Sequence, residues 1–410
     1  MKVLSACWCF SALACLPLYA KDLFNANAVT TDSLPQIAAS DSGSDLSSLV
    51  GSVIKAQGPF SAFANRDYSS FLDYANVKHA IRFDVNSGGT EAQISIPLTH
   101  LKEIFFASNR NALYGEITAF VKRDGAAEWA KFLKAINQLS AVAVSDGNPT
   151  STTALIANSM FDGFGSAASR AREINGKNNS FGISFDGGTF NADGFRGHSY
   201  TLPINGYFRA TDRMTLHVEI PLQFIEVEGA NIYQGGFTVG VPTKLVEASE
   251  NQPWSWDVTP TAAFALSGSQ AMVAGGGLFA GALTNVAAYR WQNITLTYGN
   301  FMSFFQGVRL TVGNYDFDSS VSQQIMKNGL RVSVPFADRW LFEAYGIHTK
   351  FFRSAAVNSY FTLGVDIGYR LKLKLYGNEV PLGYFTLGFH SDLAGNYDSA
   401  LFRFGSAWTF

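Results

Sequence analysis

Cysteine is almost absent from this chain. Its 410 residues contain three, Cys7, Cys9 and Cys15, and all of them lie close to the first residue. From residue 21 onward no disulfide is available, so the fold depends on packing and hydrogen bonding. Charged residues are scarce as well, at 15% against about 25% in typical soluble domains. The formal net charge of −2 offers no basic field that would favour a nucleic acid as partner.

Sequence patterns for catalysis are also missing. The chain has no HExxH, GxSxG or P-loop pattern, and these are the spacings that bring metal ligands, nucleophiles or phosphate-binding amides together. His390, Ser391 and Asp392 are adjacent, but neighbouring strand residues face opposite sides. His348 has no evident serine partner. We therefore expect no enzyme activity and no cofactor or metal, with a lipid-modifying barrel enzyme as the less favoured alternative.

One acidic stretch could supply ligands to a cation. Asn314, Asp316 and Asp318 lie at alternate positions in a long polar segment, and carboxylate and amide oxygens are the ligands that calcium prefers. A solvated acidic loop explains the same residues without a metal. We favour that interpretation.

The first twenty residues have the pattern of a secretory signal peptide. Lys2 is a short positive segment, Val3 to Leu18 form an apolar core, and Ala20 is a small residue suited to cleavage. The apolar run is shorter than the roughly 20 residues that a membrane-spanning helix needs. Removal of residues 1–20 would remove every cysteine.

The next part of the chain predicts a small α+β region. Residues 21–60 are rich in Ser, Ala, Asp and Gly, which indicates a flexible segment or a short helix. Within residues 61–175, the stretches 79–86 and 91–98 flank a turn and predict two short strands. We expect a longer strand over 111–125. Helices are predicted at 126–143 and 151–175 from apolar residues at helical spacing.

From about residue 176 the sequence consists of long segments in which apolar and polar residues alternate. In 213–225, Met214, Leu216 and Val218 share one face, and Thr215, His217 and Glu219 share the other. Segments of this length fit the 9–11 residues that a tilted strand needs to cross hydrocarbon. The predicted strands are twelve: 180–188, 198–210, 213–225, 232–245, 253–266, 271–288, 292–305, 328–337, 339–352, 357–373, 379–391 and 399–410.

An even number of such strands predicts an all-β fold, a transmembrane antiparallel up-and-down β-barrel over 176–410. Lipid offers no hydrogen bonds, so every strand edge must be paired, and only closure achieves that. Connections after even-numbered strands should be short, and the longest gap, about 306–327, should lie at the opposite end. A soluble β-sandwich is the alternative for the whole region. A pair of transmembrane helices is the alternative for the uncharged stretch 258–289.

The last residues resemble the C-terminal assembly signal of bacterial outer-membrane proteins. The matching positions are Arg403, Gly405, Trp408 and Phe410: a polar residue, a glycine, then aromatics ending on phenylalanine. The resemblance implies a bacterial outer-membrane location, contact with outer-membrane lipid and insertion by the barrel assembly machinery.

A twelve-strand barrel preceded by a helix is also similar to an autotransporter translocator domain. In that family a helix threads the lumen, and residues 151–175 could have this role. Twenty-five helical residues reach about 37 Å, enough to cross a bilayer core. Small residues at presumed inward positions, such as Gly364, Gly368 and Gly388, would leave room for a helix or would relieve strand curvature. The region 21–150 lacks the long repetitive passenger usual in the family.

Charged residues on the polar strand faces are candidates for the barrel lining. They carry both signs, which favours internal bracing over ion selection, because selective pores use rings of one sign. The candidates are Arg209, Glu219, Arg331, Glu343, Asp366, Arg370 and Arg403. Two functions remain open. One is an autotransporter-like pore plugged by the preceding helix, and the other is a structural or adhesive surface anchor without transport.

Overall fold

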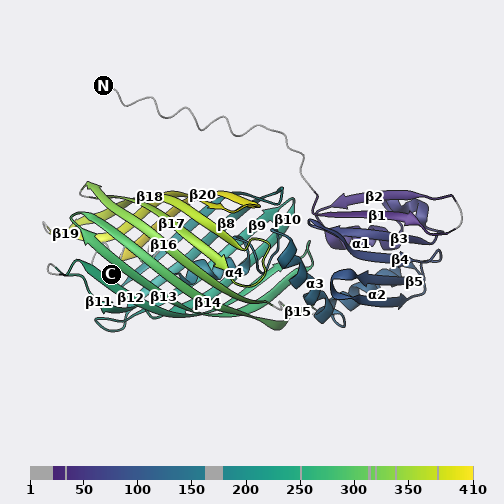
Figure 1. Ribbon diagram of the computed structural model, residues 1–410, viewed down its shortest axis with the longest axis horizontal. Coiled ribbons are helices and arrows are strands. Elements are labelled where there is room, and N and C mark those ends of the chain that lie inside the picture. Colours follow the sequence, from purple (N-terminus) through teal and green to yellow (C-terminus); the bar gives the residue numbers. More distant parts are fainter. Residues whose placement is uncertain are drawn as a thin grey trace, which may run out of the picture.

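The structure is a computed structural model in which two parts lie end to end (Figure 1). It describes residues 22–32, 35–161, 179–249, 252–312, 315–318, 321–337, 339–375 and 378–409. An N-terminal α+β domain forms one part, and a large antiparallel barrel forms the other. The predicted signal peptide, 1–20, lies outside the described residues.

The N-terminal domain is built on a single antiparallel sheet of six strands. Its strand order is β2-β1-β3-β4-β5-β6, and it does not pair with the barrel sheet. The strands are β1 (Phe24–Thr30), β2 (Ala38–Gly43), β3 (Tyr68–Tyr74), β4 (Val77–Val85), β5 (Glu91–Ile96) and β6 (Leu101–Phe106). The strand stretches predicted at 79–86 and 91–98 lie in β4 and β5.

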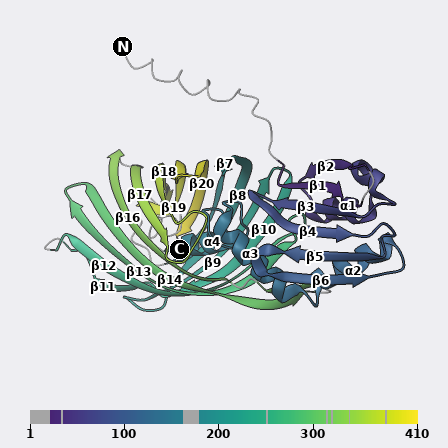
Figure 2. The ribbon, with the colours of Figure 1, turned by 45° about the vertical axis from the view of Figure 1, so that its right-hand side comes forward.

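Helices cover one face of this sheet and lead the chain into the barrel. They are α1 (Leu46–Lys55), η1 (Gly58–Phe63), η2 (Pro97–Thr99), α2 (Arg110–Lys122), α3 (Ala126–Leu139) and α4 (Thr152–Met160). In Figure 2, α3 lies at the junction of the two parts and α4 lies within the ring of barrel strands.

Of the two alternatives for 21–60, the flexible segment is wrong, because β1, β2 and α1 occupy most of it, whereas a short helix is present as α1. Helix α1 begins where the Asp45 carboxylate accepts a hydrogen bond from the Ser48 amide at 2.8 Å. Such a cap satisfies an amide that otherwise has no helical partner. Leu46, Leu49 and Val53 then follow at helical spacing and are buried. The Ser-rich composition concealed this pattern.

The strand predicted over 111–125 is also wrong, since α2 occupies 110–122. Asn109 caps this helix by accepting a hydrogen bond from the Ala112 amide at 3.0 Å. Leu113 and Ile117, four residues apart, are its buried residues. The β-prone Tyr, Ile, Thr, Phe and Val in this stretch gave a misleading local preference, which tertiary packing overrides.

Twelve strands close into a ring, as the alternation predicted (Figure 1). The ring closes where β20 pairs with β7 and where β10 pairs with β12. The strands are β7 (Ser180–Ala192), β8 (Phe195–Arg209), β9 (Thr215–Val227), β10 (Ala230–Gly240), β12 (Trp254–Ser269), β13 (Ala274–Trp291), β14 (Ile294–Val312), β16 (Ser322–Ala337), β17 (Trp340–Phe351), β18 (Ser359–Leu375), β19 (Asn378–Leu393) and β20 (Tyr397–Thr409). Two short strands, β11 (Thr243–Val246) and β15 (Tyr315–Asp318), pair with β12 and β14.

The barrel ends differ in what they carry. The N-terminal domain lies at the end formed by the β7–β8, β9–β10 and β12–β13 turns, which we call the mouth. The β7 start and the β20 end lie at the opposite end, which we call the base. At the mouth, Gly194 and Gly229 have φ of +85° and +83°. Each follows a residue that also has positive φ, which is the geometry of the tightest hairpin turns.

Connection lengths follow the prediction with one exception. The β14–β16 connection lies at the mouth, as expected for the gap at 306–327, although both strands extend into that gap. The β10–β12 connection, residues 241–253 at the base, is longer than predicted. Pro242 falls just after β10, and a proline cannot donate a ladder hydrogen bond.

The uncharged stretch 258–289 is the β12–β13 hairpin, with Ser269 opposite Ala274 at its turn. Within the described ranges no helix is both long and apolar enough to cross a bilayer.

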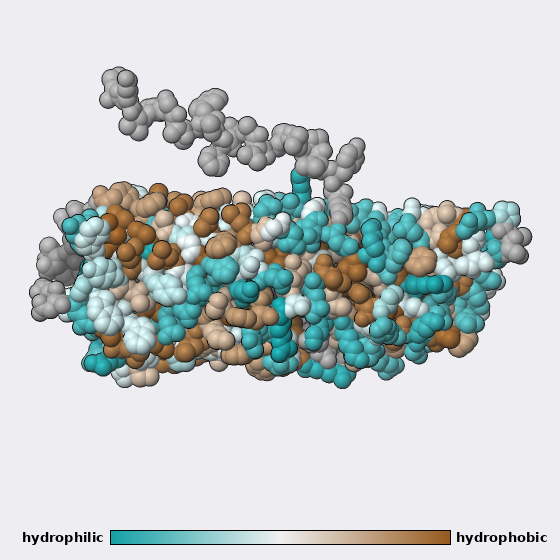
Figure 3. Space-filling view, in the orientation of Figure 1, coloured by the Kyte–Doolittle hydropathy of each residue, from teal (hydrophilic) through white to brown (hydrophobic). Residues whose placement is uncertain are grey.

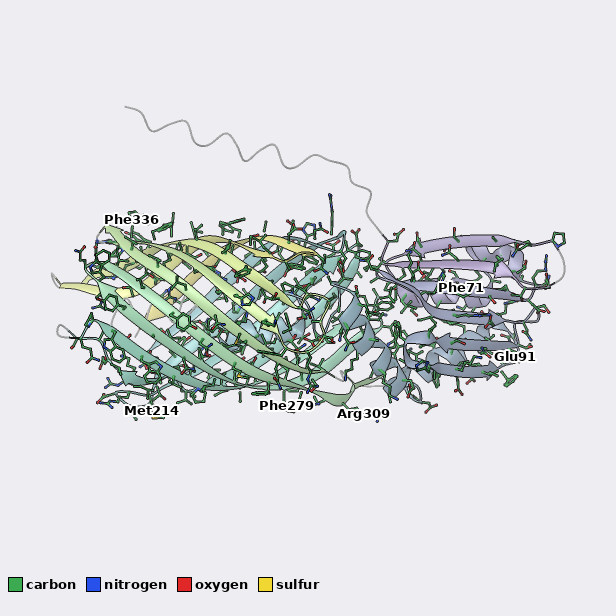
Figure 4. All side chains as sticks on the ribbon, in the orientation of Figure 1. Phe71, Glu91, Met214, Phe279, Arg309 and Phe336 are labelled. Atoms are coloured by element: carbon green, nitrogen blue, oxygen red, sulfur yellow. The ribbon has the colours of Figure 1, made fainter. Side chains whose placement is uncertain are left out.

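Hydrophobic side chains cover the outer face of the barrel. In Figure 3 hydrophobic residues gather over the barrel strands more than over the N-terminal domain. Figure 4 shows Phe279 pointing outward from the barrel wall, and Phe336 and Met214 near the base. Phe279 is 55% exposed and Leu283, on the same face of β13, is 46% exposed. Contiguous exposed apolar surface on this scale is rare in soluble monomers.

Tryptophans gather at one level of this face. Each tryptophan of the described barrel lies where its strand begins or ends at the base, and each is exposed by between 39% and 58%. These residues are Trp254, Trp256, Trp291, Trp340 and Trp408. Amphipathic aromatic rings favour the boundary between hydrocarbon and water. They therefore form the kind of aromatic girdle that borders the apolar band of a membrane barrel.

Candidate functional site

The mouth of the barrel is covered by the N-terminal domain through a specific set of hydrogen bonds. Three successive carbonyls of the β12–β13 turn each accept one bond of 2.8 Å from a different element of the domain. The Leu46 amide of α1 bonds Ala271, the Tyr74 hydroxyl of β3 bonds Met272, and the Trp129 indole of α3 bonds Val273. Burial raises the pKa of the Tyr74 phenol well above its usual range, so it remains a neutral donor.

Other turns at the mouth join the same interface. The Asp193 carboxylate in the β7–β8 turn accepts a bond from the Ala141 amide at 3.1 Å. The Val357 amide of the β17–β18 loop bonds the Gly147 carbonyl at 2.9 Å. A single buried hydrophobic cluster runs from Leu23 in the domain to Phe305 in the barrel wall. The domain is thus packed onto the mouth as part of one core.

The chain enters the lumen directly from this interface. Residues 140–149 are buried, and α4 follows them with eight of its nine residues buried. The Ser159 hydroxyl donates to the Thr238 hydroxyl of β10 at 2.9 Å, and the Thr284 hydroxyl of β13 donates to the Met160 carbonyl at 3.1 Å. A helix hydrogen-bonded to the inner wall on two strands occupies the lumen. The remainder of the helix predicted at 151–175, residues 162–175, lies outside the described residues.

Buried polar groups also hold this segment. Lys327 of β16 is 1% exposed, and its ammonium donates to the Asn158 side chain of α4. The Asp146 carboxylate accepts from Thr153 at 2.8 Å and from Gln323 of β16 at 3.0 Å. A buried charge is tolerated when it is paired or hydrogen-bonded, as here. These contacts fix the segment against β16 as well as β10 and β13.

Deeper in the lumen, Arg403 is the centre of a buried charge cluster. Its guanidinium bonds Asp186 of β7 at 2.7 Å and lies 4.0 Å from Asp366 of β18. It also donates to the Tyr345 hydroxyl of β17 at 3.3 Å. One cation thus connects β20 across the closing seam to β7 and, along the inner wall past β19, to β18 and β17. The cluster braces the ring.

Three further predicted lining residues are buried beside polar partners. Arg331 and Glu343 are each 2% exposed and lie 3.7 Å apart, and Ser333 donates to Glu343 at 2.6 Å. Glu219 is 6% exposed and lies 3.7 Å from His217. The opposite charges of Arg331 and Glu343 neutralise each other, which favours bracing over a ring of one sign.

Two predicted lining residues lie toward the base. Arg209 is at the base rim, where its half-exposed side chain pairs with Asp212 of the adjacent turn. It is the last residue of β8, in phase with the buried Tyr207, so it lies at the end of the barrel wall. Arg370 is half-buried toward the base end of β18, where its amide bonds the Arg339 carbonyl at 2.7 Å.

The remaining sequence candidates are distributed as follows. Gly405 is buried on β20, and Phe410 lies outside the described residues. Trp408 stacks on Phe181 with the two ring centroids 6.4 Å apart. His390 is buried and faces the lumen. Among the described residues no cluster of three or more histidine, cysteine or acidic residues could hold a metal. Asn314 and the Asp316 and Asp318 side chains lie outside what the structure describes.

Inward glycines have a third role, which the sequence hypotheses missed. A Cβ on Gly364 would lie 2.2 Å from the Tyr345 ring, and one on Gly368 would lie 1.8 Å from the Tyr384 hydroxyl. These glycines therefore leave room for tyrosines from the neighbouring strands to lie flat over the wall. The tyrosines fill space that was expected to be left for a helix.

Lys327, Asp186 and Tyr345 are the lumen residues that sequence reasoning missed. Lys327 shares its face of the strand with Arg331, but the strand was predicted to begin at 328 and β16 begins at Ser322. Asp186 and Tyr345 lie on predicted strands in phase with other inward residues. The alternation rule alone could have found them.

The chain has a distant likeness to solved structures. No protein-family model and no curated protein sequence matches the chain. The translocator domain of the autotransporter NalP from Neisseria meningitidis is similar over 59% of this chain and 93% of that one, at 9% identity and a TM-score of 0.41. The beta domain of the Bordetella autotransporter Brka is similar over 57% and 99%, at 11% identity and 0.39. The toluene transporter TodX of Pseudomonas putida is similar over 66% and 95%, at 9% and 0.33.

Likenesses this distant identify no function, so the geometry of the chain itself carries the argument. That geometry is a closed antiparallel barrel of twelve strands, with a hydrophobic outer face and with a lumen and mouth occupied by the chain's own preceding residues.

Proposed function

We propose that this chain is an outer-membrane barrel of the autotransporter-like kind, closed by its own threaded segment, which holds its N-terminal domain on the outer side of the membrane. The observation that carries the proposal is the position of α4. The chain leaves a domain packed on the mouth, runs inside the barrel wall, and begins β7 at the base. With the strand ends at the base on the periplasmic side, the domain is extracellular.

The outer face supports the membrane part of this proposal. Its exposed Phe, Leu, Ile and Val side chains and the girdle of tryptophans at the base match the apolar band and aromatic border of membrane barrels. The signal peptide predicted over residues 1–20 would direct the chain across the inner membrane.

Labelling of intact bacteria tests the orientation. Ser108 is exposed in the N-terminal domain and Thr211 is exposed in the β8–β9 turn at the base. Since residues 21–410 contain no cysteine, Ser108→Cys and Thr211→Cys each provide one thiol. We expect a membrane-impermeant maleimide to label Ser108→Cys on intact cells and Thr211→Cys only after the outer membrane is opened. The reverse pattern would place the domain in the periplasm.

An engineered crosslink tests the threading. The Ser159 and Thr238 hydroxyl oxygens are 2.9 Å apart, so cysteines at both positions bring two sulfur atoms close to bonding distance. We expect Ser159→Cys with Thr238→Cys to form a disulfide during assembly in the oxidising periplasm, seen as a shift in electrophoretic mobility that a reductant reverses. Ser159→Cys with Phe237→Cys is the matched control and should form no disulfide, because Phe237 is next to Thr238 in the chain but lies 47% exposed on the outer face.

The same crosslinked protein separates a plugged pore from a static anchor. If the barrel is a plugged pore, stepwise current in planar bilayers appears when the reductant frees α4 and is absent in the oxidised form. Silence in both forms contradicts the pore and leaves the anchor. A failure of the crosslink to form contradicts the threaded geometry itself.

A further inference from the structure

A cavity of about 920 Å³ lies in the N-terminal domain beside the barrel mouth. One side is the helix-covered face of β4 and β5, with Ile81, Phe83, Ile94 and Ile96. Helices α2 and α3 form the opposite side, and the β12–β13 turn closes the end toward the barrel.

The cavity is not the ordinary packing of this domain. On the β1 and β3 side of the same sheet, aromatic rings fill the interior: Phe24 lies 5.0 Å from Tyr74, and Phe63 lies 5.1 Å from Tyr68. The space on the β4 and β5 side is instead partly open to solvent. An apolar space of this size, at the upper end of the roughly 300–1,000 Å³ typical of ligand pockets, therefore has the character of a binding site.

Its lining is strongly apolar, and its polar groups are few. Besides the isoleucines of the sheet, α2 and α3 contribute Ile117, Phe120, Val121, Trp129 and Leu133. Among the described residues that line it, Lys122 is the cation, at the last turn of α2, and Asp45 is the acid. The Tyr114 hydroxyl lies 3.0 Å from Ser47 Oγ and adds a polar group. A flexible apolar chain with one polar end complements such a space.

We propose that this cavity binds one fatty-acyl chain, with the hydrocarbon between β4–β5 and α2–α3 and the polar end at Lys122, at the last turn of α2. The hydrocarbon gains by leaving water for an apolar lining. The few polar groups fix its direction, as in other small-molecule pockets. A free fatty acid and the acyl chain of a membrane lipid share this chemistry. This inference does not depend on whether the barrel conducts.

Photocrosslinking of the full chain in lipid nanodiscs tests the proposal with two probes, a diazirine-labelled sixteen-carbon fatty acid and a phospholipid with the same label on one acyl chain. We expect crosslinked peptides to contain Ile94, Ile117 or Trp129. Capture of the fatty acid identifies the free acid as the source. Capture of the phospholipid identifies a lipid chain.

Matched variants show whether capture depends on the cavity. Ala130 lines it and is 3% exposed, whereas Ala127 is exposed on the same helix. Ala130→Phe places a ring in the cavity and is expected to reduce capture at least tenfold, and Ala127→Phe to leave it unchanged. Val121→Trp fills the cavity from α2 and is a second test if Ala130→Phe fails to fold. Capture at these peptides by neither probe, or equal capture in folded filled and control variants, would overturn the proposal.

Discussion

Replacing Arg403 with methionine is expected to lower the free energy of unfolding of the barrel by about 3–5 kcal/mol, the usual cost of breaking a buried ion pair. The guanidinium bonds Asp186 at 2.7 Å, lies 4.0 Å from Asp366, and donates to Tyr345. Without it, two carboxylates stay in the lumen with no cation bridging them. Urea unfolding in micelles, followed by tryptophan fluorescence, measures the change.

An exposed arginine provides the control for the loss of a positive charge. Arg213 is exposed in the β8–β9 turn, and Arg213→Met should change stability by less than about 0.5 kcal/mol. Adding Asp186→Asn and Asp366→Asn to Arg403→Met should restore most of the loss, because no unpaired charge is left in the lumen. If the triple variant is as unstable as Arg403→Met alone, the loss comes from packing and the bracing role is wrong.

Leu283→Arg is expected to cost about 2–4 kcal/mol, the penalty for a cationic side chain at the lipid-facing midplane of a membrane barrel. Leu283 is 46% exposed and lies near the middle of β13, six residues before Tyr289 on the same face. In water the substitution would be nearly neutral, since the side chain is already exposed. The size of the effect therefore reports which solvent covers this face. Reversible unfolding in lipid vesicles measures it.

Phe106 provides the comparison. It is 70% exposed on β6 of the N-terminal domain, which the proposed orientation places in water. Phe106→Arg should therefore leave stability within about 0.5 kcal/mol of the parent chain. Equal, small effects at Leu283 and Phe106 would mean that water covers both surfaces, and the membrane proposal would then fail.

The barrel could be predicted from sequence because its two environments differ so strongly. Each strand separates a polar lumen from an apolar outer face, so alternation persists over ten or more residues, as in β18 from Phe361 to Leu373. The positions where strands begin and end were harder to predict, because the alternation of apolar and polar residues fades near the turns. Lys327 was missed for this reason. It lies in the first half of β16, where apolar and polar residues do not yet alternate regularly in the sequence.

The N-terminal domain was harder to predict because its signals are short and compete. Edge strand β2, with the sequence AASDSG, has no buried apolar residue and is defined by pairing with β1. The helices α1 and α2 each carried a cap, Asp45 and Asn109, that indicates a helix start. Composition and β-prone residues masked both signals. The docking on the β12–β13 turn depends on backbone carbonyls, which leave no trace in side-chain patterns.

The position of α4 constrains the order in which this protein can be made. The ring is sealed by the pairing of β7 with β20, while the residues leading to β7 enter from the mouth, where a six-stranded sheet stands. Because the folded sheet lies at the mouth and β7 begins at the base, a barrel that has already closed cannot be passed over an N-terminal domain that has already folded. Either the segment that contains α4 is enclosed while β7 pairs with β20, or the N-terminal domain passes through the barrel unfolded and forms its sheet afterwards.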